Sequence, residues 1–467
     1  MSRTRERSTS SVALKSAQPL LVPLLLLLHL LLTLSLAYKL NIWVDEAFSL
    51  GTTERGVGYG LRQALNFELQ APLYFLLLSL WRKINSSIFF ARLFSVACVG
   101  LAIQVTAQLA RRFFRDVHPA WFVAAVAFNP LVIIVAVDVR LYALVLLLTA
   151  LLLLAFHDGY LSETPSRRAQ VCYVVLALAA LYTQYYMGFL LVANACALCA
   201  LKRWRALVEY LVGMVAVGLC FAPMLPFIRY QMSAHTAPMQ NRETWFEGFK
   251  FVTWRMKDYV LPPGWDFSLV VRSWILRLCY LGTLVLLGYR FALYLLHKKR
   301  HILTPEFIAL WTITLVVTLF FLFTARLSGE MLLQIRHTIV LFLPVNLAVF
   351  ALVRLAENRR VLYVWVCLVL LFSLTALFEH YRPLAKYGDW QRVAAYLMSE
   401  EQPGQAILVF HAGAALPLER YYAGRNALVP LPRENTFERF DFHDYVLRDE
   451  REITAALERA PGDDETI

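Results

Sequence analysis

Two adjacent carboxylates, Asp45 and Glu46, follow the first long apolar run of the chain. That run, Leu20 to Tyr38, is dominated by Leu and is long enough to cross a bilayer core of roughly 30 Å. The pair is therefore expected at the boundary between lipid and water. A carboxylate placed there can act as a general base on a substrate whose lipid tail stays in the bilayer. The alternative is a solvated loop charge, which the apolar WV before the pair and AF after it make the weaker interpretation.

The composition is that of a multi-pass membrane protein. Of the 467 residues, 59% are hydrophobic and 17% are charged, and the mean hydropathy is +0.56, whereas soluble domains carry about 25% charged residues. The formal net charge is +12. The Lys and Arg residues gather in short loops between apolar runs, which is the pattern that sets membrane topology and argues against nucleic acid as a partner. Among the seven cysteines, no Cys-x-x-Cys pair is accompanied by a second such pair, so a zinc site or a disulfide framework is not expected.

Eleven apolar runs are expected to cross the membrane. They are 19–38, 88–110, 119–137, 141–157, 169–184, 187–201, 206–228, 268–296, 303–325, 332–354 and 361–379. With the basic N-terminus as an uncleaved cytoplasmic anchor, each Lys and Arg cluster falls on the cytoplasmic side. Pro72 to Lys83 is not counted, because about twelve residues make a helix of only ~18 Å; it is expected as an amphipathic helix in the outer interface. An odd count places the C-terminal tail on the outer face.

The tail differs from the rest of the chain. Residues 1–379 are expected to form the transmembrane domain, with the acidic motif in outer loop 39–87, and residues 380–467 a small periplasmic α/β domain. WQRVAAYLMSEE predicts a helix, QPGQ a turn and AILVF a buried strand. A second helix is predicted in REITAALER, with the next strand expected only after it, so that the tail reads as incomplete at its end.

This topology gathers further polar residues at the outer face. They are Asp138, Arg140 and Tyr142 in the second outer loop, Tyr182, Gln184, Tyr185 and Tyr186 in the third, Arg255 in the fourth, and Arg336 with His337 at a later helix start. Ionisable groups at membrane depth usually mark a site or a substrate path. Plainer interpretations stay open: a helix-end ion pair for Asp138 and Arg140, an aromatic belt for the tyrosines, and end anchors for Arg336 and His337.

Several ordered motifs carry a resemblance that covers nearly the whole chain. They are WVDEAFS, QAPLYFLLLSLW, ARLFSVACVG, AVDVRLYAL, LYTQYYMG, IRHTIVLFLP and YGDWQRVAAYL. In this order they resemble the GT-C glycosyltransferases that use lipid-phosphate-linked sugars, the relatives of protein O-mannosyltransferases and of the aminoarabinose and galacturonic acid transferases of bacteria. The resemblance implies an all-α polytopic GT-C fold of about eleven transmembrane helices with the small α/β tail.

The resemblance also implies roles for single residues. Asp45 would be the catalytic carboxylate, Glu46 its partner and Asp138 the acidic residue of the second outer loop. Arg336 would meet the carrier phosphate. Two positions depart from the pattern, because Gln70 and Gln184 stand where relatives often have His. The remaining substrate-binding candidates are His337, Arg140, Tyr142, Gln70, Tyr74, Tyr185 and Arg255.

These roles combine into one hypothesis. A sugar on a polyprenyl phosphate would be attacked by a lipid, glycan or protein acceptor at the outer face of a bacterial inner membrane, with Asp45 as base and Arg336 on the leaving phosphate. A divalent ion, Mg²⁺ or Mn²⁺, bridging Asp45 or Glu46 with Asp138 is a further hypothesis. The alternatives are a lipid or glycan transporter (a flippase), for which no paired half-chain repeats are visible, and a glycan ligase or polymerase.

Overall fold

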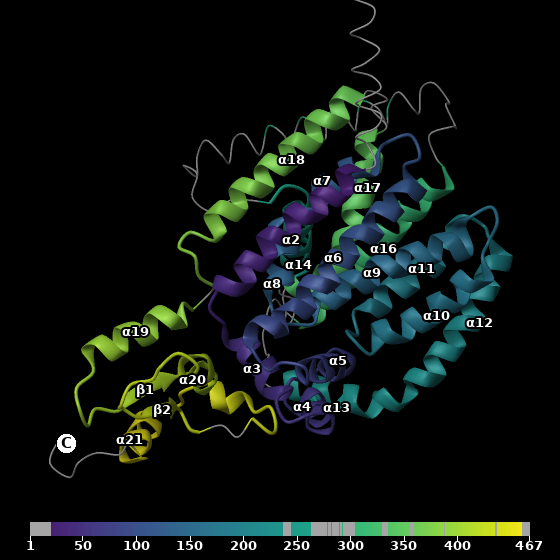
Figure 1. Ribbon diagram of the computed structural model, residues 1–467. Coiled ribbons are helices and arrows are strands. Elements are labelled where there is room, and N and C mark those ends of the chain that lie inside the picture. Colours follow the sequence, from purple (N-terminus) through teal and green to yellow (C-terminus); the bar gives the residue numbers. More distant parts are fainter. Residues whose placement is uncertain are drawn as a thin grey trace, which may run out of the picture.

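Apolar helices form a bundle, and smaller elements cover one of its ends (Figure 1). The computed structural model describes residues 20–236, 244–262, 304–328, 335–354, 359–386, 388–434 and 437–459, and residues 278, 282, 289 and 292 singly. The bundle helices are α2 (Leu21–Lys39), α6 (Ile88–Phe113), α7 (Pro119–Ala127), α8 (Pro130–Val137), α9 (Tyr142–Phe156) with a π-helical turn (His157–Leu161), α10 (Arg167–Leu181), α11 (Met187–Ala200), α12 (Trp204–Phe221), α14 (Trp245–Val260), α16 (Pro305–Ser328), α17 (Phe342–Arg354) after a 3₁₀ turn (Ile335–Leu341), and α18 (Arg359–His380).

Helix α9 lies at the centre of this bundle, because its sequence is apolar on every side. Thirteen of its residues, among them Tyr142, Ala150 and Phe156, are buried, and it packs against α6, α8 and α10. A helix that is hydrophobic all round can be stable only where other helices or lipid surround it. By contrast, α12 leaves Val208, Val212 and Val215 exposed, as expected for a helix that faces lipid.

The number of crossings differs from the expectation. Among the described residues, seven helices are long and apolar enough to span a membrane, or eight if the bent pair α7–α8 is one span. The count of eleven is therefore not confirmed. Helices α10 and α11 occupy two expected crossings but have only 15 and 14 residues, which at 1.5 Å per residue fall short of the roughly 30 Å core. The expected crossing at 268–296 lies outside the described residues.

The expected straight crossing at 119–137 is broken in the middle. Helices α7 and α8 meet at an angle of 68°. Pro130 lacks an N–H and disfavours helical geometry in the residue before it, so the first helix ends before Asn129. Asn129 then starts the second helix, because its Oδ1 accepts the Leu131 N–H at 2.9 Å. The bend directs the end of α8 so that Asp138 follows at the covered end of the bundle.

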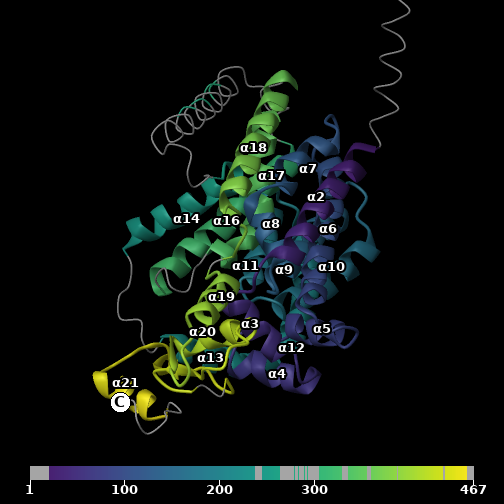
Figure 2. The same ribbon diagram turned by 60° about the vertical axis from the view of Figure 1, so that its left-hand side comes forward.

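Short helices and the tail share this covered end (Figures 1 and 2). Between α2 and α6 lie α3 (Val44–Thr52), α4 (Val57–Asn66) and α5 (Leu73–Arg82); α13 (Leu225–Thr236) follows α12 through a 3₁₀ turn (Ala222–Met224). The tail contributes α19 (Trp390–Glu400), β1 (Ile407–Phe410), α20 (Ala412–Glu419), β2 (Leu428–Leu431), a 3₁₀ turn (Phe442–Tyr445) and α21 (Glu450–Arg459). Helix α5 has only ten residues, in agreement with its prediction as a short helix that does not cross.

The tail folds as a β–α–β unit around a two-stranded parallel sheet, β1 beside β2. The strand in AILVF and the helix in REITAALER are confirmed. The strand expected after α21 lies outside the described residues. The described second strand, β2, comes before α21 and was not predicted; it is a short LVPL segment that alternates between half-buried and buried residues. Helix α20 of the tail packs against α3, and the Ile42 N–H donates to the Tyr421 hydroxyl at 2.8 Å.

Candidate functional site

The Asp45–Glu46 pair opens helix α3. Trp43 precedes the helix in an extended conformation, and both carboxylates stand in the first turn, where the partial positive charge of a helix N-terminus favours them. The two side chains nevertheless have different surroundings. Glu46 is completely buried, whereas the side chain of Asp45 is 20% exposed.

Glu46 accepts hydrogen bonds on both carboxylate oxygens. Arg92 of α6 donates to it from two nitrogens, each at 3.1 Å, the Val139 N–H donates at 3.0 Å, and Lys386 of the tail lies 2.8 Å away. Burial by itself would raise the pKa of Glu46, but the charges and hydrogen bonds of Arg92 and Lys386 hold it below its ordinary value. Glu46 is thus a fully satisfied carboxylate anion, and its catalytic role stays a prediction.

Arg92 ties the end of α2 to this carboxylate. Its guanidinium also donates to the backbone oxygens of Ala37, Leu40 and Asn41 at 2.7–2.9 Å. These carbonyls lie at and beyond the C-terminal end of a helix, where backbone acceptors lack partners within the helix. One buried side chain therefore fixes the path of the chain from α2 into α3.

Asp138 is held from the tail. Lys386 Nζ lies 2.6 Å from Asp138 Oδ1 and donates to the Val137 carbonyl at 2.9 Å, and the backbone N–H of the same lysine donates to Asn41 Oδ1 at 2.7 Å. The Asp138 side chain is 10% exposed and that of Lys386 is 7% exposed. A single ammonium group thus neutralises two carboxylates, those of Glu46 and Asp138.

Arg140 forms a second centre of charge beneath Asp45. Its Nη1 donates to the Asp45 carbonyl at 3.2 Å, to Ser49 Oγ at 2.9 Å and to Glu68 Oε2 at 2.9 Å. Burial raises the pKa of Glu68 above its ordinary value, although Arg140 opposes this shift. Thr52 Oγ1 donates to the other oxygen of Glu68 at 3.2 Å. Arg140 therefore binds α3 through the Asp45 carbonyl and the Ser49 hydroxyl, and it does not contact the carboxylate of Asp45.

Asp45 itself pairs with Arg336. Arg336 Nη2 lies 2.8 Å from Asp45 Oδ2, and the two side chains are 21% and 20% exposed. The guanidinium also lies over the Trp43 ring, 4.7 Å from its centroid, a favourable cation–π arrangement. Arg336 Nε is buried and has no hydrogen-bond partner among the described residues. This pair is the accessible part of the charged network, which we define as Asp45, Glu46, Glu68 and Asp138 with Arg92, Arg140, Arg336 and Lys386.

The remaining candidates for substrate binding whose side chains the structure describes are buried or half-buried residues. Tyr142 is buried, and its ring is 6.0 Å from that of His337, which also lies 6.4 Å from Tyr186. Tyr74 is buried, with a hydroxyl that has no hydrogen-bond partner among the described residues. Gln70 is half-buried and follows Leu69, whose φ of +51° is strained.

Two candidates are not brought to Asp45 by any contact of the described residues. The Tyr185 hydroxyl donates to Gln231 Oε1 at 2.9 Å, and Gln231 donates in turn to the Leu65 carbonyl at 3.2 Å. Tyr185 therefore connects the α10–α11 turn to α13, and Gln231 connects α13 to α4. Arg255 belongs to helix α14, but its side chain lies outside what the structure describes.

The described side chains do not fit a divalent ion at Asp45 and Asp138. They contain no group of three or more His, Cys, Asp or Glu residues arranged to hold a metal. Arg336 occupies one carboxylate and Lys386 the other, whereas Mg²⁺ needs several oxygen ligands around one point. The metal hypothesis thus has no support in this donor set.

Three members of the network are absent from the sequence prediction: Arg92, Glu68 and Lys386. Arg92 falls inside an apolar helix, where a lone charge signals a buried partner. Glu68 lies two residues before the QAPLYF motif, and Lys386 immediately precedes YGDW. Both motifs can be recognised in the sequence, but the residue that joins the charged network is the charged neighbour of each motif, Glu68 or Lys386.

The sequence matches no protein-family model and no curated protein. Among solved structures, the chain is similar to the crystal structure of ArnT from Cupriavidus metallidurans in the apo state, with a TM-score of 0.53 and 16% identity over 97% of this chain and 92% of that chain. The fold is of the GT-C type. The crystal structure of the same ArnT bound to undecaprenyl phosphate aligns with a TM-score of 0.42 and 14% identity, over 90% of this chain and 87% of that chain. The GT-C fold expected from the motifs is therefore confirmed, and the helix count is not.

Proposed function

We propose that this chain is a membrane glycosyltransferase that moves a sugar from a polyprenyl-phosphate donor to an acceptor hydroxyl. The observation that carries the proposal is the Asp45–Arg336 pair, in which a base and a phosphate-binding cation are both accessible in an otherwise buried network. Glu46, Glu68 and Asp138 are each at most 10% exposed. The GT-C fold supports the proposal by analogy, because fold alone does not determine activity.

Arg336 is suited to the leaving phosphate. A guanidinium binds phosphate oxygens through parallel N–H donors, and its Nε has a donor not used within the described residues. A donor phosphate that binds Arg336 competes with Asp45 for this guanidinium. Binding of the donor then releases the Asp45 carboxylate from its partner at the moment when a base is needed.

The proposed reaction is a single displacement. The acceptor oxygen attacks the anomeric carbon, the bond from that carbon to the phosphate oxygen breaks, and Asp45 takes the acceptor proton. The bonding electrons leave with the polyprenyl phosphate, whose added negative charge is stabilised by Arg336. Attack opposite the leaving group inverts the configuration at the anomeric carbon. The buried ion pairs of Glu46 and Arg140 hold α3 so that Asp45 faces this reaction.

The proposed setting is the inner membrane of a bacterium. We place the N-terminus in the cytoplasm and the tail, together with α3–α5, on the outer side, because Lys and Arg clusters then fall on the cytoplasmic side. The tail (380–467) is proposed as a separate small domain that covers the outer end of the bundle. A transporter or flippase, and a glycan ligase or polymerase, are the competing functions.

Asp45→Asn tests the assignment of the base. The amide keeps the size of the side chain but cannot accept the proton, so transfer should fall by roughly 10²–10⁴-fold. The measurement is release of free polyprenyl phosphate from a labelled polyprenyl-phosphate sugar, with and without acceptor, by purified protein in nanodiscs. Asn should leave the melting temperature nearly unchanged. Near-normal turnover by this variant, or no acceptor-dependent release by the wild type, would contradict the proposal, and movement of intact donor across the bilayer would favour the flippase.

A further inference from the structure

A cavity lies beside α3. Its volume is about 390 Å³, within the roughly 300–1,000 Å³ of small-molecule pockets. Asp45 and Ser49, one helical turn apart, face Arg336 and Arg140, whereas Phe48 and Thr52, also one turn apart, line this cavity. The charged network and the cavity therefore lie against adjacent faces of one helix.

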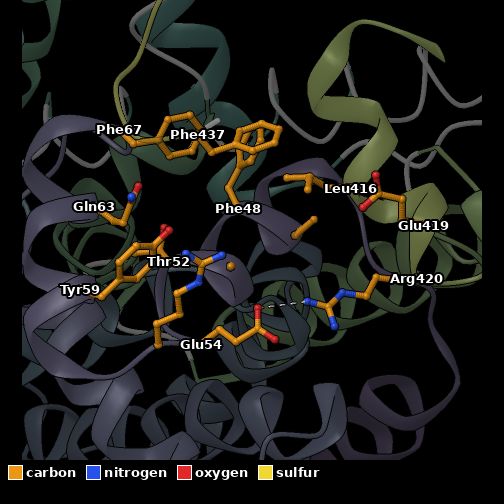
Figure 3. Close-up of a pocket in the computed structure, with 13 residues that line it drawn as sticks. Phe48, Thr52, Glu54, Tyr59, Gln63, Phe67, Leu416, Glu419, Arg420 and Phe437 are labelled. Carbon is orange, nitrogen blue, oxygen red and sulfur yellow. Dashed lines mark ion pairs between the residues drawn. The ribbon is translucent and has the colours of Figure 1, made fainter. Parts of the chain in front are cut away.

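The walls of the cavity combine aromatic faces with planar polar groups. Phe48, Phe67 and Phe437 form one side, with ring centroids 5.2–5.9 Å apart, and the Glu54 and Arg420 side chains lie on the opposite side (Figure 3). All of its lining residues come from α3, α4, the turns beside them and the tail, so no membrane-spanning helix contributes. A lipid chain in the bilayer therefore does not reach it.

This chemistry fits a sugar ring. The C–H face of a sugar packs on aromatic rings, and its vicinal hydroxyls match the paired donors or acceptors of a guanidinium, a carboxylate or an amide. The opposite charges of Glu54 and Arg420, 3.9 Å apart, are both largely solvated, so the pair is weak and its groups can turn to a ligand. An apolar ligand would make no hydrogen bond to either group.

Gly51 is the clearest sign that the cavity is kept open. It lies within α3, has no positive φ, and a Cβ added to it would meet no atom within 4 Å. Neither backbone conformation nor packing requires glycine there, although glycine weakens a helix. Gly60 of α4 differs, because its Cβ would come within 2.8 Å of Ser79 Oγ. The space that Gly51 leaves empty is part of the cavity.

We infer that this cavity binds a sugar unit of a glycan-bearing acceptor. The inference rests on the proposed function and narrows its acceptor to a glycan. A hydrogen-bonded path joins the cavity to the reaction site, from Thr52 to Glu68 to Arg140 and the Asp45 carbonyl. A glycan held by a distant sugar would present its reacting hydroxyl to Asp45 across the same helix.

Gly51→Leu tests the inference by filling the cavity without removing any native group. The matched control is Gly58→Leu in α4, where an added Cβ also meets no atom within 4 Å but which does not line the cavity. Each protein, in nanodiscs, is applied to an array of bacterial envelope oligosaccharides printed without lipid. The wild type and Gly58→Leu should bind a common set of glycans, and Gly51→Leu should bind them at least roughly tenfold more weakly.

A second variant and a binding control separate the outcomes. Arg420→Gln, which removes a charge at the cavity but no packing group, should also weaken glycan binding, while binding of undecaprenyl phosphate stays the same in all variants. Equal glycan binding by Gly51→Leu and the wild type, or binding of peptides but no array glycan, overturns the inference. The array needs no turnover, so a wild type that binds glycans but transfers no sugar refutes the proposed function and leaves the cavity assignment standing.

Discussion

At the scale of residues, exposure separates carboxylates that look alike in the sequence. Asp45 and Glu46 are neighbours, yet one pairs with an accessible arginine and the other is enclosed by Arg92 and Lys386. A buried carboxylate with every oxygen satisfied cannot readily take a proton from a substrate, because its ionised form is already stabilised. The proposal therefore gives the catalytic role to Asp45 and its partner Arg336.

Arg336 should be sensitive even to a conservative change. Arg336→Ala removes the positive charge proposed for the leaving phosphate, and kcat/KM for the donor should fall by roughly 10²–10³-fold. Arg336→Lys should recover part of this loss, because lysine keeps the charge but not the planar pair of donors. Steady-state kinetics with varied donor concentration checks both. If Arg336 only anchors the end of a helix, the dependence of the rate on donor concentration should be unchanged in both variants.

Part of this site could be predicted from the sequence. Asp45, Asp138, Arg140 and Arg336 were all singled out, because charged residues at the ends of apolar runs are visible in a pattern. Their partners were not, since pairing across the bundle depends on which helix ends meet. The different exposure of Asp45 and Glu46 also required the structure, because the direction of each side chain depends on how α3 packs.

At the scale of elements, Glu46 and Arg92 join three helices. The carboxylate belongs to α3, the guanidinium to α6, and the carbonyls that it also binds lie at the end of α2. Hydrophobic patterning predicted α2 and α6 but neither α3 nor this junction. The bend between α7 and α8 was missed for a related reason, because both halves are apolar and only the Asn129–Pro130 step marks the break.

Glu46→Gln should destabilise this junction by about 3–5 kcal/mol, because Arg92 and Lys386 lose a buried counter-charge. The effect should depend on pH. The pKa of Glu46 is lower in the fold than its ordinary value of 4.5, so its stabilisation is fully present above that value and is lost as the pH falls below it. The difference in melting temperature between wild type and variant should therefore shrink in acid. A parallel pH course for both proteins would contradict the assignment, and the exposed Glu400→Gln serves as control.

At the scale of the whole molecule, the tail belongs to the site. Lys386 reaches both Glu46 and Asp138, and α20 covers α3. The composition change near residue 380 identified the tail, and the strand and helices within it were largely predictable. The packing of the tail against α3 could not be predicted, because its contacts join residues more than three hundred positions apart, such as Ile42 and Tyr421.

Lys386→Met should loosen this attachment. Methionine keeps the length of the side chain but leaves the buried Asp138 carboxylate without its cation and Glu46 with Arg92 alone, which should cost about 3–5 kcal/mol. Proteolysis in detergent should then release the tail more readily, and sugar transfer should fall with it. Arg392→Gln, which breaks an exposed ion pair with Asp389 in the same tail, should change stability by less than about 0.5 kcal/mol. Equal protection of the tail in the wild type and Lys386→Met would refute this role.

The lysine also sets an order for biogenesis. Glu46 and Asp138 are synthesised and inserted long before the ribosome reaches Lys386, and until then the two carboxylates have only Arg92 between them as a buried counter-charge. Like charges brought together out of water repel strongly. The covered end of the first helices is therefore expected to pack only after the segment that carries Lys386 has been synthesised. A chain interrupted before Lys386 is thus expected to leave this end of the bundle open and acidic.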